Sequence, residues 1–423
     1  MALSLAFHII FACIGMTMPF LMIISNWLWL KRKEDIYLKL TKTWSKGVAI
    51  FFAIGAVSGT VLSFELGLLW PKFMKHAGAV IGMPFSLEGT AFFIEAIFIG
   101  LFLYGWNKLS PYAHWISGLI VGISGVISGI FVVTANAWMN APTGFDWVNG
   151  KAINIDPVAA MFNPAWISET LHMTIAAFVA TSFGVAGLHA ILLLRGKNSA
   201  LHKKAMIIAL AFGSIFAILQ PISGDFSAKD VAKRQEIKLA AMEGHFKTEK
   251  NAHLTIGGIP NEQTGTTEYG IKIPYLLSFL AYGNFHAEVK GLNDYDKSVW
   301  PPVLPVHLSF QVMVGIGFLL ALVGVVFWLI RFKWKDAITN KKFLQLIALC
   351  TPLGFIAVEA GWIVTEVGRQ PWIIFGIMKT SEAVTPAPFQ IYHFILFAIV
   401  YLMLSIIAVW LMRRQIIALD KSI

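Results

Sequence analysis

Six side chains that could bind a metal or carry a proton lie within, or at the ends of, apolar stretches of the sequence, where ionisable groups are costly. They are His8, Glu88, Glu95, His172, Met313 and Glu366. Imidazole, thioether and carboxylate groups all ligate iron, and a His/Met axial pair suits a low-spin haem that transfers electrons. Glu88 and Glu95 are seven residues apart, so both carboxylates are expected on one face of a helix. The residue types therefore indicate iron ligation and proton chemistry inside a membrane.

The elements that position these side chains are predicted to be membrane-spanning helices. Of the 423 residues, 57% are hydrophobic and only 13% are charged, whereas soluble domains carry roughly 25% charged residues. A helix needs about 20 apolar residues to cross a bilayer. We therefore predict an all-α integral membrane protein with about nine transmembrane helices, in residues 3–30, 47–69, 87–106, 114–139, 166–194, 205–221, 305–330, 344–366 and 389–412.

One long polar stretch divides this series of helices. Residues 1–222 are predicted to hold helices 1–6, residues 223–304 a long outer loop, and residues 305–423 helices 7–9 with a short cytoplasmic tail. A loop of this length in a compact protein is more often functional than not.

The distribution of Lys and Arg predicts the orientation in the membrane. Most of them lie in loops on the side that also carries the C-terminus, so this side is predicted to be cytoplasmic and the N-terminus and long loop to lie outside. In this topology Glu88 opens the third helix, and the proposed ligands all lie in the outer half at similar depth. The net charge of +10 reflects the same bias towards basic cytoplasmic loops and requires no nucleic-acid partner.

The Cys and His content excludes several redox centres. Cys13 and Cys350 lie far apart in the sequence, so they cannot form the thiolate set of an iron–sulfur cluster, and no CxxCH haem-attachment motif is present. The sequence also shows no His-His pair, which argues against a haem–copper oxidase because its copper centre needs clustered imidazoles.

Several motifs, in order along nearly the whole chain, closely resemble subunit I of the cytochrome bd quinol oxidases, in the class with a short outer loop. GRQPW is the most specific part of the resemblance. The motifs are SLEGTAFFIEA (86–96), LHMT (171–174), KLAAMEG (238–244), SFQVMVGIGF (309–318) and GWIVTEVGRQPW (361–372).

The resemblance implies a set of cofactor ligands. It makes His172 and Met313 the axial ligands of a low-spin haem b. It assigns His8 and Glu366 to a second pair of haems, a high-spin haem b and a haem d (or a further haem b), without deciding which residue serves which haem. Glu88 would then be the carboxylate at haem d.

The resemblance also implies roles for other polar residues. Glu95 would be a second carboxylate of the proton route or of the haem pair. Lys238 and Glu243 match loop residues implicated in quinol oxidation. Arg369 could neutralise a haem propionate or a neighbouring carboxylate. One departure from the family pattern is Gln311, which stands where Arg is common and would lower the potential of the low-spin haem if it faced that haem.

The activity implied is that of an electrogenic terminal oxidase in a prokaryotic cell membrane. Quinol would be oxidised at the outer loop, its protons released outside, and dioxygen reduced to water with cytoplasmic protons. This would generate a proton-motive force without a proton pump. The partners implied are a second large membrane subunit, small single-helix subunits, quinol, dioxygen and the lipid bilayer.

Two other functions are compatible with parts of the sequence. A quinone-linked cytochrome b subunit would pass electrons to an acceptor other than oxygen. A proton-coupled transporter would use Glu88, Glu95, Glu359 and Glu366 as a relay, which explains the carboxylates but not His172 with Met313.

Overall fold

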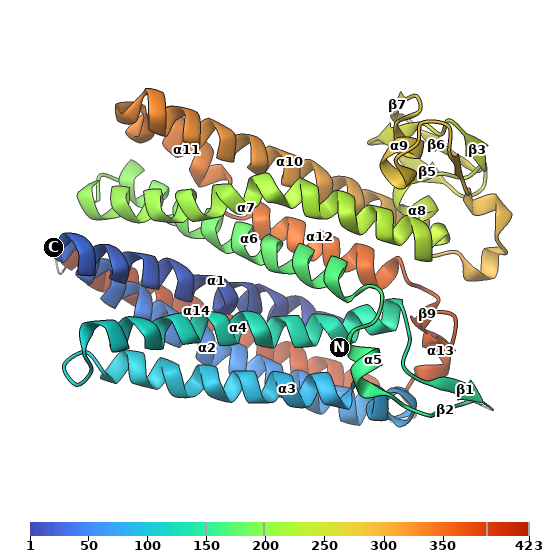
Figure 1. Cartoon of the computed structure of the whole chain (residues 1–423), viewed down its shortest axis with the longest axis horizontal. Helices are drawn as coiled ribbons and strands as arrows, with labels where there is room; N and C mark the ends of the chain where they lie inside the picture. Colours follow the sequence, from blue (N-terminus) through green and yellow to red (C-terminus); the bar gives the residue numbers. More distant parts are fainter. Residues whose placement is uncertain (149, 198, 386–387, 422–423) are drawn as a thin grey trace.

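The computed structural model describes residues 1–148, 150–197, 199–385 and 388–421, and its main feature is a bundle of long helices (Figure 1). Within these residues, nine helical spans are long and apolar enough to cross a membrane, which confirms the predicted fold class. Eight spans lie in single helices, and α11 and α12 together make the ninth. The long helices are α1 (Ala2–Arg32), α2 (Asp35–Leu69), α3 (Pro71–Tyr104), α4 (Pro111–Asn140), α6 (Trp166–Leu194), α7 (Ser199–Arg234), α10 (Val303–Lys333), α11 (Lys341–Leu349), α12 (Leu353–Val367) and α14 (Gln390–Lys421).

Short elements occupy the connections between these helices. Five antiparallel two-stranded sheets form, pairing β1 with β2, β3 with β8, β4 with β7, β5 with β6 and β9 with β10. The helical connections are α5 (Pro157–Met161), α8 (Glu236–Glu243), α9 (Leu276–Tyr282), α13 (Thr380–Ala383), η1 (Leu292–Asp294), η2 (Lys297–Val299) and η3 (Lys335–Thr339). The strands are β1 (Asp146–Val148), β2 (Lys151–Ile153), β3 (Glu249–Lys250), β4 (Leu254–Ile256), β5 (Ile259–Asn261), β6 (Thr266–Glu268), β7 (Ile271–Ile273), β8 (Glu288–Val289), β9 (Trp372–Ile374) and β10 (Met378–Lys379).

Three helices extend well beyond their predicted ends. Helix α2 begins at Asp35 instead of residue 47. Helix α3 begins at Pro71 instead of residue 87. Proline is well suited to the first position of a helix, because the backbone N–H that it lacks would have no hydrogen-bond partner there. Helix α7 continues to Arg234 instead of ending at residue 221. Its polar extension is stabilised by ion pairs between residues four apart, Asp225 with Lys229 and Asp230 with Arg234. Residues 223–234 are therefore helical.

The long helices form two neighbouring groups. Helix α6 lies along α7, and α10 packs against both α7 and α12, while α1, α2, α3 and α4 pack in succession. In Figure 1 the N-terminus, the strands and α8 lie at one end of the bundle, and the C-terminus lies at the other. The segment between α7 and α10 therefore shares an end with the start of α1 and the end of α12.

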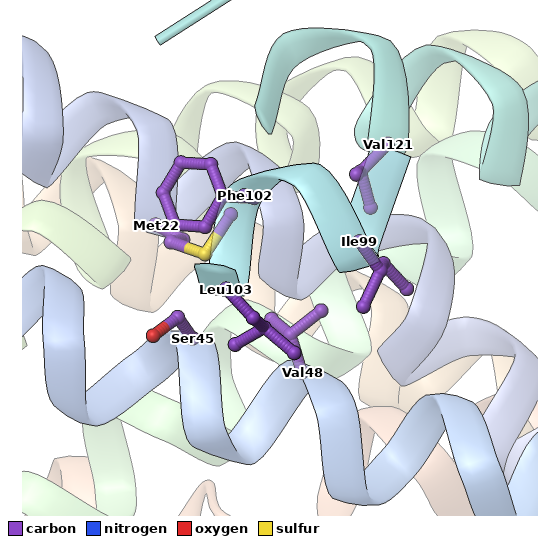
Figure 2. Close-up of a pocket in the computed structure, with 7 residues that line it drawn as sticks. All are labelled: Met22, Ser45, Val48, Ile99, Phe102, Leu103 and Val121. Carbon is purple, nitrogen blue, oxygen red and sulfur yellow. The ribbon is translucent and has the colours of Figure 1, made fainter. Parts of the chain in front are cut away.

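The interior towards the opposite end is tightly packed. A cavity of about 10 Å³ between α1, α2, α3 and α4 is lined by Met22, Ser45, Val48, Ile99, Phe102, Leu103 and Val121 (Figure 2). A space of this size is at the lower limit for one water molecule, and Ser45 is its only polar side chain. This part of the bundle therefore serves as an apolar core.

Candidate functional site

His172 lies near the start of α6 and faces α7. Its Nδ1 is 3.1 Å from the hydroxyl of Ser223, and the amide nitrogen of Gln220 lies 3.2 Å from its Nε2. A Cβ added to Gly224 would lie 3.5 Å from the imidazole ring, so a small residue lets α7 approach closely. The serine contact fixes the ring orientation in the manner typical of a metal-ligating histidine, whose other nitrogen is hydrogen-bonded.

Met313 lies on α10 against the backbone of α12. A Cβ added to Gly361 would lie only 2.9 Å from the Met313 sulfur. The thioether can therefore lie against α12 at this point only because residue 361 has no side chain. Helix α12 also packs against α6, which carries His172. The two predicted axial ligands thus belong to one group of helices, α6, α7, α10 and α12 (Figure 1).

His8 lies near the start of α1 and contacts α2 in a similar way. Its Nδ1 is 2.8 Å from the hydroxyl of Ser58, and a Cβ on Gly59 would lie 3.1 Å from its Cε1. About two turns further along α2, the fully buried Glu65 accepts a hydrogen bond of 2.6 Å from Ser4 and pairs with the N-terminal amine. The sequence prediction missed Glu65, although a carboxylate inside an apolar segment is itself a signal of function or of a buried ion pair.

Glu366 forms the centre of an ion pair at the end of α12. Its Oε2 accepts a hydrogen bond of 2.6 Å from Nη2 of Arg369, and its Oε1 accepts one from the side chain of Asn136 on α4. Arg369 is only 2% exposed, and its Nε and Nη1 are buried without a hydrogen-bond partner. The guanidinium therefore has capacity for a second anion.

A second polar group adjoins this ion pair. Asn140, at the end of α4, donates to Glu169 on α6 at 3.0 Å and accepts from Lys238 on α8 at 3.4 Å. Lys238 also donates to the Thr365 carbonyl at 3.3 Å. The sequence prediction missed Glu169 and Asn140. Glu169 precedes His172 by about one helical turn at the start of an apolar helix, which is the signal that could have revealed it.

The two predicted quinol residues, Lys238 and Glu243, both lie on α8 and are both buried. They are five residues apart, which turns their side chains by about 140° around the helix axis, and Lys238 points towards α4 and α12. Burial, the largest cause, lowers the pKa of Lys238 to about 8, although the nearby Glu169 carboxylate acts in the opposite direction. Burial raises the pKa of Glu243 to about 8, and its Oε2 has no hydrogen-bond partner.

Glu88 and Glu95 lie on one face of α3, as predicted from their spacing, and both face α4. Ser128 donates to Glu88 at 3.3 Å, and a Cβ on Gly125 would lie 3.4 Å from an oxygen of Glu95. However, the prediction that Glu88 opens its helix is wrong, because α3 begins at Pro71. Glu88 lies about 25 Å along the helix axis from that residue.

The predicted common depth of the ligands is therefore also wrong for Glu88. Glu88 contacts α4 at Ser128, whereas Glu366 contacts the same helix at Asn136. These two contact points are about 12 Å apart along the axis of α4. The two carboxylates consequently occupy separate regions of the bundle.

The segment between α7 and α10 is fastened to α10 by hydrogen bonds, and two side chains of α10 bind its backbone. Gln311 accepts from the Gly257 N–H at 2.9 Å and donates to the Thr255 carbonyl at 3.1 Å. The ring of His307 lies 2.8 Å from the Met242 carbonyl and 3.1 Å from that of Gly257. The side-chain amide of Gln311 is thus bound to the backbone of this segment.

Comparison with known proteins decides the family. Residues 1–419 match the family model described as cytochrome bd terminal oxidase subunit I. The chain belongs to the cytochrome bd terminal oxidase subunit I family.

Individual relatives agree with this assignment. The chain is 34% identical to a putative cytochrome bd menaquinol oxidase subunit I of Bacillus subtilis over 97% of its own length and 93% of that protein. It is 28% identical to a cytochrome bd-II ubiquinol oxidase subunit 1 of Escherichia coli, over 90% and 88% of the two chains. Among solved structures, it matches the bd oxidase of Geobacillus thermodenitrificans with a TM-score of 0.93 and 38% identity, covering 98% and 96% of the two chains.

Membership of the cytochrome bd family establishes the coarse function. The chain is a multi-pass membrane subunit of a bacterial quinol:oxygen oxidoreductase that carries haem, and it assembles with a second subunit. This excludes the transporter that the sequence left open.

The residues of this cytochrome bd chain fit the haems that the family carries. Arg369 has buried nitrogen atoms without partners that suit a propionate, and His8 and His172 are each held through Nδ1 by a serine. Among the residues whose positions are described, no three His, Cys, Asp or Glu side chains gather to hold a bare metal ion.

One expectation about the histidines was wrong. His189 on α6 and His202 on α7 are buried with their Nδ1 atoms 2.9 Å apart. The two histidines are 13 residues apart in the sequence and lie on two successive helices, so a search for adjacent histidines does not find this pair. The family assignment, rather than the absence of a His-His pair, is what excludes a haem–copper oxidase.

Proposed function

We propose that this chain holds three haems in two regions of the bundle. His172 and Met313 would hold the iron of a low-spin haem b, and His8, Glu366 and Glu88 would serve a high-spin haem b and a haem d or further haem b. Bound haem supplies electron transfer and the reduction of dioxygen. The wide separation of the Glu88 and Glu366 contacts along α4 supports the assignment of these carboxylates to different haems.

Quinol is oxidised at α8, where Lys238 orients a quinol oxygen and Glu243 accepts a proton. The observation that carries this proposal is the position of Lys238. Its ammonium lies in the same buried polar group as Glu366 and Arg369, so the substrate side and the cofactor side meet at the end of α12. Arg369 pairs with Glu366 and uses its remaining nitrogen atoms to neutralise a propionate.

The orientation in the membrane makes this reaction electrogenic. The basic loops lie in the cytoplasm, and the N-terminus and the segment carrying α8 lie outside. Protons from quinol are then released outside, while Glu95 and Glu88 hold protons taken up from the cytoplasm for the formation of water. A proton-motive force arises without a pump. Small single-helix subunits complete the complex beside the second large subunit.

A reduced-minus-oxidised visible spectrum of the purified complex tests the haem assignment. The unmodified complex is expected to show low-spin b, high-spin b and a red-shifted chlorin band from haem d, or b bands alone where the third haem is b. Met313→Leu is expected to abolish the low-spin b signal, whereas Met403→Leu, on an exposed part of α14, should leave it intact. An unchanged low-spin signal in Met313→Leu overturns the ligand pair.

A further inference from the structure

Asn140 is the point at which helices α4, α6 and α8 meet through hydrogen bonds. Its Nδ2 donates to Glu169 on α6 at 3.0 Å and to Oδ1 of Asn136 on its own helix at 3.3 Å. Its Oδ1 accepts from Lys238 at 3.4 Å, and its backbone carbonyl accepts from Gln235 at 2.9 Å. The side chain is buried, with only 4% of its surface exposed, so these contacts replace water.

Two connections lead from Asn140 to Glu366. One runs through Asn136, whose amide donates to the Glu366 carboxylate. The other runs through Lys238, which donates to the carbonyl of Thr365, the residue next to Glu366. The Lys238 side chain also packs on this turn, because a Cβ added to Gly368 would lie 3.1 Å from its Cε. Asn140 is therefore bound both to a proposed quinol residue and to the partner of a proposed haem ligand.

The charges of this region balance each other. Two carboxylates, Glu169 and Glu366, lie close to two cations, Lys238 and Arg369. Buried charges are tolerated only when they are paired and hydrogen-bonded, and removing one member leaves the others uncompensated. Glu169 has no place in the proposed haem or quinol chemistry, and its position beside Asn140 makes it the counter-charge for Lys238.

We propose that Asn140 is a positioning residue that couples the quinol side of the site to the haem carboxylate, with Glu169 as the buried counter-charge that holds Lys238 in place. The inference rests on the proposed function of Lys238 and Glu366. An asparagine suits this position because its amide offers a donor and an acceptor at once. The donor serves Glu169 and Asn136, and the acceptor serves Lys238 and Gln235.

The test uses the purified complex with Asn140→Ala, Asn140→Asp and Lys238→Met, and two readouts. The first is KM and kcat for quinol, and the second is the visible spectrum after reduction with dithionite, which needs no quinol. Asn140→Ala is expected to raise KM about tenfold, a loss of about 1.4 kcal/mol, and to shift the band of the haem held by Glu366. Asn140→Asp keeps the acceptor for Lys238. Its KM for quinol is therefore expected to match that of the unmodified complex, whereas its haem band is expected to stay shifted.

A matched control separates coupling from simple loss of structure. Asn163 is buried near the same helix ends and binds only the backbone of Thr134, Ala160, Met161 and Ala165. Asn163→Ala should lower thermal stability without changing KM or the band position. If Asn140→Ala behaves like Asn163→Ala, the coupling role is refuted.

The Lys238→Met variant distinguishes failure of the coupling role of Asn140 from failure of the proposed quinol site. The effects of Asn140→Ala and Lys238→Met on KM should be non-additive, because both substitutions remove the same contact between Asn140 and Lys238. If Lys238→Met lowers quinol affinity while Asn140→Ala changes neither the KM for quinol nor the haem band, only the coupling role of Asn140 is overturned. If Lys238→Met leaves KM and kcat unchanged, the proposed quinol site itself is overturned.

Discussion

Met313 lies so close to the α12 backbone that a Cβ at Gly361 would be 2.9 Å from its sulfur atom. Real Cβ atoms do not approach other atoms this closely, so a methyl group at residue 361 must displace the thioether. The packing of these two helices thus sets where the proposed low-spin haem ligand can lie.

The first prediction concerns this contact. Gly361→Ala is expected to weaken the bond between Met313 and haem iron and to lower the midpoint potential of the low-spin haem, because the thioether favours the reduced metal. A spectroelectrochemical titration of the purified complex measures the change. Gly47→Ala, where an added Cβ meets nothing within 4 Å, is the control. An unshifted potential in Gly361→Ala would contradict the claim that this contact sets the position of the Met313 sulfur.

The second prediction concerns the serines that hold the two histidines. Ser223→Ala removes the hydroxyl beside Nδ1 of His172, and Ser58→Ala removes the one beside His8. Loss of such an outer partner commonly costs about 10–100-fold in metal affinity or activity, so each variant should lose haem from one site during purification. Haem content and spectra measure the loss.

The control for both serines is Ser63→Ala. The Ser63 hydroxyl is exposed and bonds only to the carbonyl of Gly59 in its own helix. Haem content should therefore stay at the level of the unmodified complex. Equal haem loss in all three variants would argue against a role for the serines in holding the rings.

The third prediction concerns pH. Burial raises the pKa of Glu243 from 4.5 to about 8, so its carboxyl group is mainly protonated below pH 8 and accepts a proton only above it. The kcat/KM for quinol should therefore rise as the pH approaches 8 and fall above it, because the Lys238 ammonium, whose pKa is lowered to about 8, then loses its proton. Glu243→Gln should remove this rise, whereas Glu268→Gln, an exposed substitution in β6, should retain it. A pH profile of Glu243→Gln that matches the unmodified complex would contradict the role of Glu243 as a base.

The same shift has a consequence for stability. The folded chain binds the Glu243 proton more tightly than the unfolded chain, so its contribution to stability is fully present below pH 4.5 and is lost as the pH rises through about 8. Thermal unfolding of the complex should therefore depend less on pH in Glu243→Gln across this range.

The fourth prediction concerns Gln311. Gln311→Leu removes two hydrogen bonds to the backbone of Gly257 and Thr255, each worth about 0.5–1.5 kcal/mol. We expect faster hydrogen exchange in residues 254–273, a higher KM for quinol and an unchanged potential of the low-spin haem. Val312→Ala, on an exposed part of α10, is the control. A shifted potential with unchanged exchange would mean that Gln311 acts on the haem directly.

The sequence predicted the transmembrane architecture well, because apolar segments of sufficient length leave the backbone in a bilayer few alternatives to a helix. It did not predict helix ends at Pro71 and Arg234, since charged residues near a membrane boundary can continue a helix as well as end it. The misplaced start of α3 is the reason that Glu88 was assigned to the wrong depth.

The candidate site could be predicted only in part. His172, Met313 and Glu366 stand out by residue type within recognisable motifs. Asn140 and Glu169 become evident only in three dimensions, because their importance lies in contacts with Lys238 and Asn136 that join three separate segments of the chain. The sequence also could not predict which way the Gln311 side chain points, because a side chain one position further along the helix faces a different neighbour.

The attachment of the α8–β8 segment to α10 has a consequence for how such chains diverge. His307 and Gln311 bind only main-chain atoms of that segment, at Met242, Thr255 and Gly257. Main-chain groups are the same whatever side chains accompany them, so substitutions in the segment leave the attachment intact as long as its backbone path is kept. Substitutions can therefore change the side chains of this proposed quinol-facing region without changing its register on α10, the helix that carries the proposed haem ligand Met313.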